Sequence, residues 1–208
     1  MSTLRLATLA LATLLLAAGG CASSTHSGVA DANGTNVAGA KRCNTCTAHG
    51  LTGKQGLEWF KGLAGKDGQP GKWVAHTKGE DGKDHDLVVQ YKTVSSGSAV
   101  CETLFPGTPH EMITMYHLDG DNLIATHYCA MGNQPRMQAV LCACDSARKT
   151  CNFKFLDGTN MDAAKDNFMG NQDYAFTGPD SLTIAWHNLG PGGVDEKPTF
   201  GGDFRRVN

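Results

Sequence analysis

The chain has 208 residues, with 18 lysines and arginines against 20 aspartates and glutamates, and a net charge of −2. The basic residues are scattered and form no stripe, which argues against a nucleic-acid partner. One long apolar run lies at the start of the sequence and is too short for a comfortable transmembrane helix. We therefore expect a membrane anchor at most, and no membrane span.

The first 21 residues have the features of an export signal. Arg5 is the only charge before Asp31, and the run Leu6–Ala18 has about the length of a signal h-region. The run ends in small residues directly before Cys21. This ending resembles the lipobox of bacterial lipoproteins, in which the cysteine is lipidated and becomes the new N-terminus. The alternative is an ordinary cleaved signal peptide with an incidental cysteine.

The resemblance to lipoproteins implies a signal peptide over residues 1–20 and a membrane partner through acyl chains on Cys21. It places the protein in the bacterial cell envelope. Ala22 stands where lipoproteins kept at the inner membrane often carry Asp, so we expect the outer membrane, facing the periplasm. Small and polar residues then predict a flexible tether over 21–50, before one domain over 51–208.

The domain begins with one short helix and continues in strands. Apolar residues at helical spacing predict the helix between Gly56 and Gly65, followed by a glycine-rich loop to Gly71. Alternating apolar residues bounded by turn signals then predict about ten short strands. They are Lys72–Thr77, Asp86–Val94, Ala99–Phe105, Glu111–Leu118, Leu123–Tyr128, Arg136–Ala143, Asn152–Leu156, Tyr174–Thr177, Ser181–His187 and Thr199–Arg206.

This order predicts an all-β fold: an antiparallel up-and-down barrel of about 8–10 strands with a short N-terminal helix. Short strands joined by tight turns form a meander, and closing the meander removes the exposed edges that an open sheet would present.

Two sets of residues resemble the lipocalins and their calycin relatives. Gly71-Lys72-Trp73 opens the first strand, where those families carry a Gly-x-Trp motif at the barrel floor. Their tryptophan is covered by an arginine from a late strand, a role that Arg205 or Arg206 would take here. The stretch from Tyr91 to Met137, including Asn133-Gln134-Pro135-Arg136, also resembles uncharacterised bacterial lipocalin-like domains. The resemblance implies a calycin-like barrel without an established activity.

Strand parity across the hairpins predicts which residues face inward. We expect Glu102 and Glu111 on the outer face and a carboxylate-free inner face. The residues predicted to face inward are Cys101, Thr103, Phe105, His110, Met112, Thr114, Tyr116, Leu123, Ala125, His127, Cys129, Met137, Ala139, Leu141 and Ala143.

Small wall residues and adaptable methionines favour a cavity for a small apolar ligand. The residues predicted to contact this ligand are Phe105, Met112, Tyr116, His127, Cys129 and Met137. The alternative is a structural envelope lipoprotein whose barrel is filled by its own side chains.

A second alternative is a sensor or enzyme that binds haem or a transition metal through His110, His127 and Cys129, since imidazole and thiolate suit such ions. We expect no cofactor otherwise. The sequence lacks a nucleophile elbow, a His-Glu-x-x-His pair, a P-loop and a dinucleotide fingerprint, which lowers the expectation of an enzyme without deciding it.

Seven cysteines follow Cys21, so at least one is unpaired within the chain. Cys144 and Cys151 flank a six-residue loop and are the best disulfide prediction. A four-thiolate zinc site is the competing use, made of Cys43, Cys46, Cys142 and Cys144.

Overall fold

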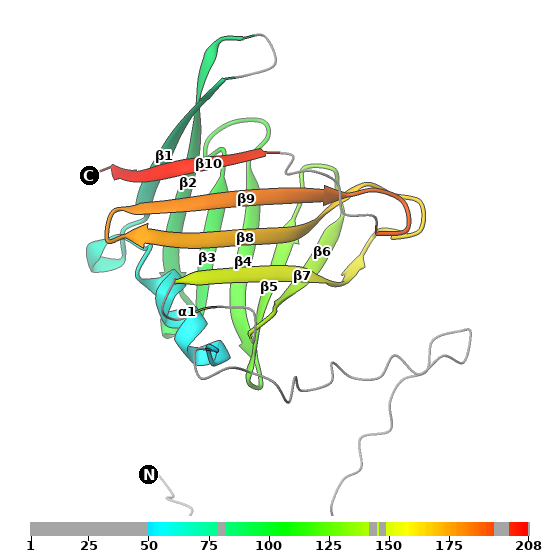
Figure 1. The fold of residues 1–208 in the computed structure, drawn as a ribbon, viewed down its shortest axis with the longest axis horizontal. Helices are drawn as coiled ribbons and strands as arrows, with labels where there is room; N and C mark the ends of the chain where they lie inside the picture. The colour runs from blue at the N-terminus through cyan, green and yellow to red at the C-terminus, as the bar shows by residue number, and fades with distance from the viewer. Residues whose placement is uncertain (1–49, 79–81, 142–144, 146–148, 194–199, 208) are drawn as a thin grey trace, which may run out of the picture. The chain divides into compact units, whose positions relative to one another are not determined.

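The computed structural model describes residues 50–78, 82–141, 145, 149–193 and 200–207. In this part of the chain, ten antiparallel strands form a closed barrel with one short α-helix at its N-terminal side. Each strand pairs with its neighbours in sequence, and the first pairs with the last (Figure 1). The predicted all-β, up-and-down barrel is therefore confirmed.

Several predictions fall on residues outside the described ranges. They concern the signal peptide, Cys21, the tether up to residue 49, and Cys43, Cys46, Cys142 and Cys144.

Each predicted strand overlaps one observed strand. The observed strands are β1 (Gly71–Lys78), β2 (Asp84–Val94), β3 (Ala99–Leu104), β4 (Met112–Asp119), β5 (Asn122–Tyr128), β6 (Gln134–Ala139), β7 (Thr150–Thr159), β8 (Phe168–Gly178), β9 (Ser181–Leu189) and β10 (Phe200–Val207). Strand β8 is much longer than predicted, because its first half buries the polar residues Asn171 and Gln172, which hide the apolar signal of an inner face.

Helix α1 (Gly53–Lys61) starts one turn earlier than predicted. The Thr52 side chain accepts a hydrogen bond from the Gln55 backbone N–H, and the Gln55 side chain accepts one from the Thr52 N–H. This capping box satisfies N–H groups that the first turn would leave unpaired. The buried face of the helix carries Leu57 and Phe60, so α1 packs across one end of the barrel, near the β4–β5 turn.

The barrel end beside α1 is closed by Trp73 and Arg206. The Trp73 indole N–H donates to the Leu63 carbonyl at 2.9 Å, and the Arg206 guanidinium lies 4.4 Å from the centre of the Trp73 ring. Arg206 also donates to three carbonyls just beyond α1 and pairs with Asp180. Arg205 is exposed and takes no part in this floor.

The structure explains why the first residue of the Gly-x-Trp motif, Gly71, is a glycine. A Cβ at this position would lie 2.1 Å from the Leu63 carbonyl oxygen, so only glycine lets β1 start this close to the chain that follows α1. The close approach brings Trp73 within hydrogen-bonding distance of the same carbonyl.

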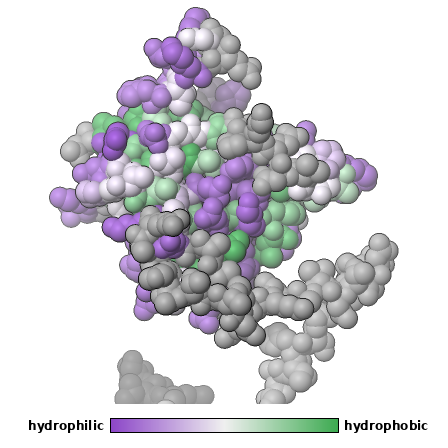
Figure 2. Space-filling view, in the orientation of Figure 1, coloured by the Kyte–Doolittle hydropathy of each residue, from purple (hydrophilic) through white to green (hydrophobic). Residues whose placement is uncertain are grey.

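Aromatic rings fill much of the barrel. The Phe60 ring stacks on Tyr116, with centroids 4.1 Å apart, and lies edge-on to Phe153 and Tyr174. These four side chains are almost completely excluded from solvent. On the surface of the molecule, hydrophilic and hydrophobic residues are interspersed on the face shown in Figure 2.

The predicted inner face is wrong for β3. Leu104 pairs with Met112, so the β3–β4 connection spans residues 105–111 and is longer than the four-residue loop that parity required. Phe105 leaves the strand in the left-handed region, with φ of 51°. The register shifts by one residue, which turns Cys101 and Thr103 outward and buries Glu102 completely.

Candidate functional site

Three oxygen atoms meet in the middle of the barrel. The Tyr116 and Tyr174 hydroxyls lie 2.7 and 2.8 Å from the same Glu102 oxygen, Oε2, and 2.6 Å from each other. The three side chains come from β4, β8 and β3. Each faces inward because it occupies an alternate position of a half-buried strand. We call Glu102, Tyr116 and Tyr174 the carboxyl–tyrosine triangle.

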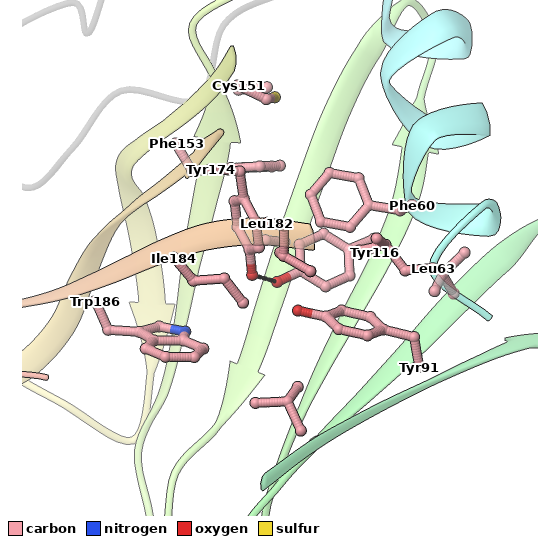
Figure 3. Close-up of a cluster of buried hydrophobic side chains, with 14 of the residues drawn as sticks. Phe60, Leu63, Tyr91, Tyr116, Cys151, Phe153, Tyr174, Leu182, Ile184 and Trp186 are labelled. Carbon is pink, nitrogen blue, oxygen red and sulfur yellow. Dashed lines mark hydrogen bonds between the residues drawn. The ribbon is translucent and has the colours of Figure 1, made fainter. Parts of the chain in front are cut away.

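Two more polar side chains border the triangle. The Tyr116 hydroxyl lies 3.2 Å from Gln172 Oε1. Tyr91 reaches the same region from β2. Figure 3 shows its hydroxyl pointing to the barrel centre, toward the hydroxyls of Tyr116 and Tyr174. The barrel therefore has a polar centre within an aromatic interior, in contrast to the carboxylate-free inner face expected from the sequence.

Burial controls the acid–base properties of the centre. It raises the pKa of Glu102, and hydrogen bonds from Tyr116 and Tyr174 oppose that shift only in part. Burial also raises the pKa of Tyr91 well above its usual value, with Glu102 raising it further. The tyrosines are therefore un-ionised at neutral pH and act as hydroxyl donors or acceptors.

Four buried polar atoms inside the barrel have no hydrogen-bond partner among the described residues. They are Tyr91 Oη, Glu102 Oε1, His127 Nε2 and Trp186 Nε1. The Trp186 indole nitrogen is turned toward the interior in Figure 3. Nearly all buried polar groups in native proteins have a partner, so several unpaired atoms in one interior point to a function.

The end of the barrel away from α1 forms an apolar mouth. A narrow apolar recess lies there between β2, β3, β9 and β10, and in this conformation its free volume is about 0 Å³, too little for a water molecule. Its lining residues are Leu87, Val88, Val89, Leu104, Phe105, Trp186 and Phe200. The Trp186 ring stacks on Phe200 with centroids 4.6 Å apart, so a stacked aromatic pair forms one wall of the recess.

His127 lies on the inner wall of β5. Its Nδ1 is 3.0 Å from the Thr114 hydroxyl, and its Nε2 is the unpaired atom. Burial lowers the pKa of His127 from 6.5 to about 4, so the imidazole is neutral at physiological pH. One ring nitrogen is thus oriented by a neighbour while the other stays available.

The other predicted cavity residues lie along the same wall or at the mouth. Met137 is completely buried, whereas Met112 and Cys129 are half-buried, with Cys129 Sγ 3.8 Å from Met112 Sδ. Phe105 lies at the mouth, 6.0 Å from the Phe200 ring centre. Tyr116 belongs to the carboxyl–tyrosine triangle.

The predicted metal trio is not assembled. His110 is exposed in the β3–β4 connection, whereas His127 is fully buried. Within the described ranges, no three side chains of His, Cys, Asp or Glu lie together as metal ligands. His127 is therefore the one member of the trio that keeps an unpaired buried nitrogen.

A wider hollow of about 340 Å³ lies outside the barrel, beside α1 and the β8–β9 turn. Trp59 and Phe176, which pack edge to face at 5.2 Å, form its apolar part. None of the unpaired buried atoms among the described residues belongs to its lining. We take the barrel interior as the candidate site because of its unpaired polar atoms, since free volume favours the outer hollow.

Comparison with known proteins adds no functional assignment: no family model matches the chain, and neither does any curated protein. Within the residues that the structure describes, no helix is both long and apolar enough to cross a membrane.

Proposed function

We propose that this protein is a lipid-anchored protein of the bacterial envelope whose barrel binds a small, largely apolar ligand. The observation that carries the proposal is the set of unpaired polar atoms inside an otherwise apolar barrel. The mouth has no free volume in this conformation, so a ligand would have to displace mouth side chains such as Phe105 or Phe200 to enter. It would then contact apolar side chains along its length and reach the polar centre with one end. Ligand sites commonly combine apolar walls with a few convergent polar groups in this way.

The proposed cellular location rests on the sequence. The lipobox-like ending at Cys21 supports a lipid anchor, and Ala22 supports delivery to the outer membrane. The small and polar residues that follow would act as a tether between the lipid and the barrel.

A fluorescent apolar dye tests the binding function. Wild-type protein should bind the dye with saturation and a stoichiometry of one. Met112→Trp should reduce this binding, because Met112 packs against the core and pairs with Leu104 of the mouth, so that a larger ring there would crowd the entrance. Ile113→Trp is the matched control, since Ile113 is the next residue along β4 and lies on the outer face, 36% exposed. Equal binding by both variants, or none by the wild type, would refute the proposal.

The orientation of His127 favours a second candidate function, the binding of haem or a transition metal through Nε2. A metal-binding histidine usually has its other ring nitrogen held by a hydrogen bond, as Thr114 does here. Metal analysis and a visible absorption spectrum, after expression with supplementation, test this candidate. Stoichiometric metal or haem that is lost in His127→Ala but kept in His110→Ala would support it, and absence from the wild type would end it.

A further inference from the structure

The carboxyl–tyrosine triangle contains more short contacts than an ionised carboxylate can explain. Each of its three oxygen–oxygen distances, 2.6 to 2.8 Å, is a hydrogen-bond length and requires one proton. Two phenols supply two protons. Gln172 Oε1, at 3.2 Å, can only share the proton of the Tyr116 hydroxyl and supplies none. The third proton must come from Glu102, which is therefore a neutral carboxylic acid.

The surroundings agree with a neutral carboxyl. The buried polar and charged side chains among the described residues are Glu102, Thr114, His127, Asn133, Asn171, Gln172 and His187, without a lysine or arginine. An ionised carboxylate buried without a cation is strongly disfavoured, and such a group takes up a proton instead.

A neutral Glu102 presents a defined pattern to a ligand. With its proton on Oε2 inside the triangle, the unpaired Oε1 is a carbonyl oxygen and accepts a hydrogen bond. The Tyr91 hydroxyl has no hydrogen-bond partner among the described residues, but Glu102 and Tyr174 lie near enough to raise its pKa, so it is a donor close to that acceptor. Trp186 can donate only. A ligand hydroxyl, which both donates and accepts, matches an acceptor beside a donor. A ligand carboxylate matches poorly, because it cannot donate and finds no cation among the buried side chains of the described residues. An ammonium group matches poorly, because it cannot accept from Tyr91 or Trp186.

We propose that the barrel selects apolar ligands with an uncharged hydroxyl-type head group, held at Glu102 Oε1 and Tyr91 Oη, and rejects carboxylates and ammonium groups. The inference rests on the proposed ligand-binding function. It names the head group, which the dye experiment leaves open.

Displacement of the apolar dye by three probes of equal chain length tests the selection: 1-decanol, decanoate and decylamine at pH 7.5. We expect decanol to bind at least about tenfold more tightly than either charged probe, since burying an unpaired polar or charged group costs at least this factor. Equal or tighter binding of decanoate or decylamine would overturn the inference, as would dye binding that no probe displaces. Failure of the dye itself to bind would instead remove the proposed function.

Two variants and one spectrum keep the test independent of folding defects. Tyr91→Phe should weaken decanol binding about tenfold, whereas Tyr128→Phe, altered at an exposed tyrosine, should not. In the infrared, the wild type at pH 7.5 should show the carbonyl band of a protonated carboxylic acid, absent from Glu102→Gln. A wild-type spectrum without this band would refute the neutral carboxyl.

Discussion

Acid should destabilise this protein partly through one residue, His127. Its imidazole has a pKa of about 4 in the folded chain, against 6.5 for an ordinary histidine, because burial disfavours the charged form. Between these two pH values the unfolded chain binds more protons than the folded one. The His127 contribution to the free energy of unfolding is therefore fully present above pH 6.5 and is lost as the pH falls toward 4.

The size of the loss follows from the shift. A difference of about 2.5 pKa units corresponds to roughly 3 kcal/mol, at about 1.4 kcal/mol per unit. His127→Asn places an uncharged amide near the Thr114 hydroxyl and removes the titration. The variant should lose about 3 kcal/mol less than the wild type between pH 7 and pH 4.

Chemical denaturation at a series of pH values measures this difference, with the variant curve subtracted from the wild-type curve. Subtraction is needed because Glu102, whose pKa burial raises, acts in the opposite sense and favours the folded state at lower pH. His110→Asn is the control, since His110 is exposed. Parallel wild-type and His127→Asn curves would show that the imidazole does not titrate as its burial requires.

Three further predictions concern the floor, the wall and the anchor. Arg206→Leu should cost about 2–4 kcal/mol of unfolding free energy, because it leaves carbonyls beyond α1 and the Trp73 ring without their partner, whereas Arg205→Leu should cost under about 0.5 kcal/mol. Denaturant titration compares the two variants, and equal losses of unfolding free energy would contradict the role of Arg206 in closing the barrel end. Ala125→Leu should cost about 1–3 kcal/mol if the fully buried wall is solid there, and little if a cavity accepts the extra methyl groups, so the melting temperature decides between the two. Cys21→Ser should abolish incorporation of a labelled fatty acid into the protein. Label on the variant, or no label on the wild type, would contradict the prediction that Cys21 is lipidated.

Much of the fold could be predicted from local signals. Turn residues such as Asp119-Gly120 marked the strand ends, and Gly71-Lys72-Trp73 marked the start of the first strand, because these features depend on neighbouring residues only. The parity of β4 and β5 was also right, since a two-residue turn fixes their register.

The polar centre could not be predicted in the same way. It depends on Glu102 facing inward. The pairing of β3 with β4 is shifted by one residue from the predicted register, and this shift turns Glu102 inward. Avoidance of buried carboxylates, a sound rule for most cores, favoured the wrong face. Tyr116 and Tyr174 are 58 residues apart in sequence, and only closure of the barrel brings their hydroxyls together. Val100 and Leu104, the apolar residues two positions before and after Glu102, were the one local signal of its true face.

Native mass spectrometry of the full-length protein, with any membrane-bound form released gently, tests the central claim most directly. The account predicts one non-covalent small molecule per chain in addition to any acyl groups, carrying an uncharged polar end. The same molecule should be depleted in Met112→Trp and kept in Ile113→Trp. A wild-type protein that carries no such molecule and takes up none of the dye would contradict a ligand-binding barrel.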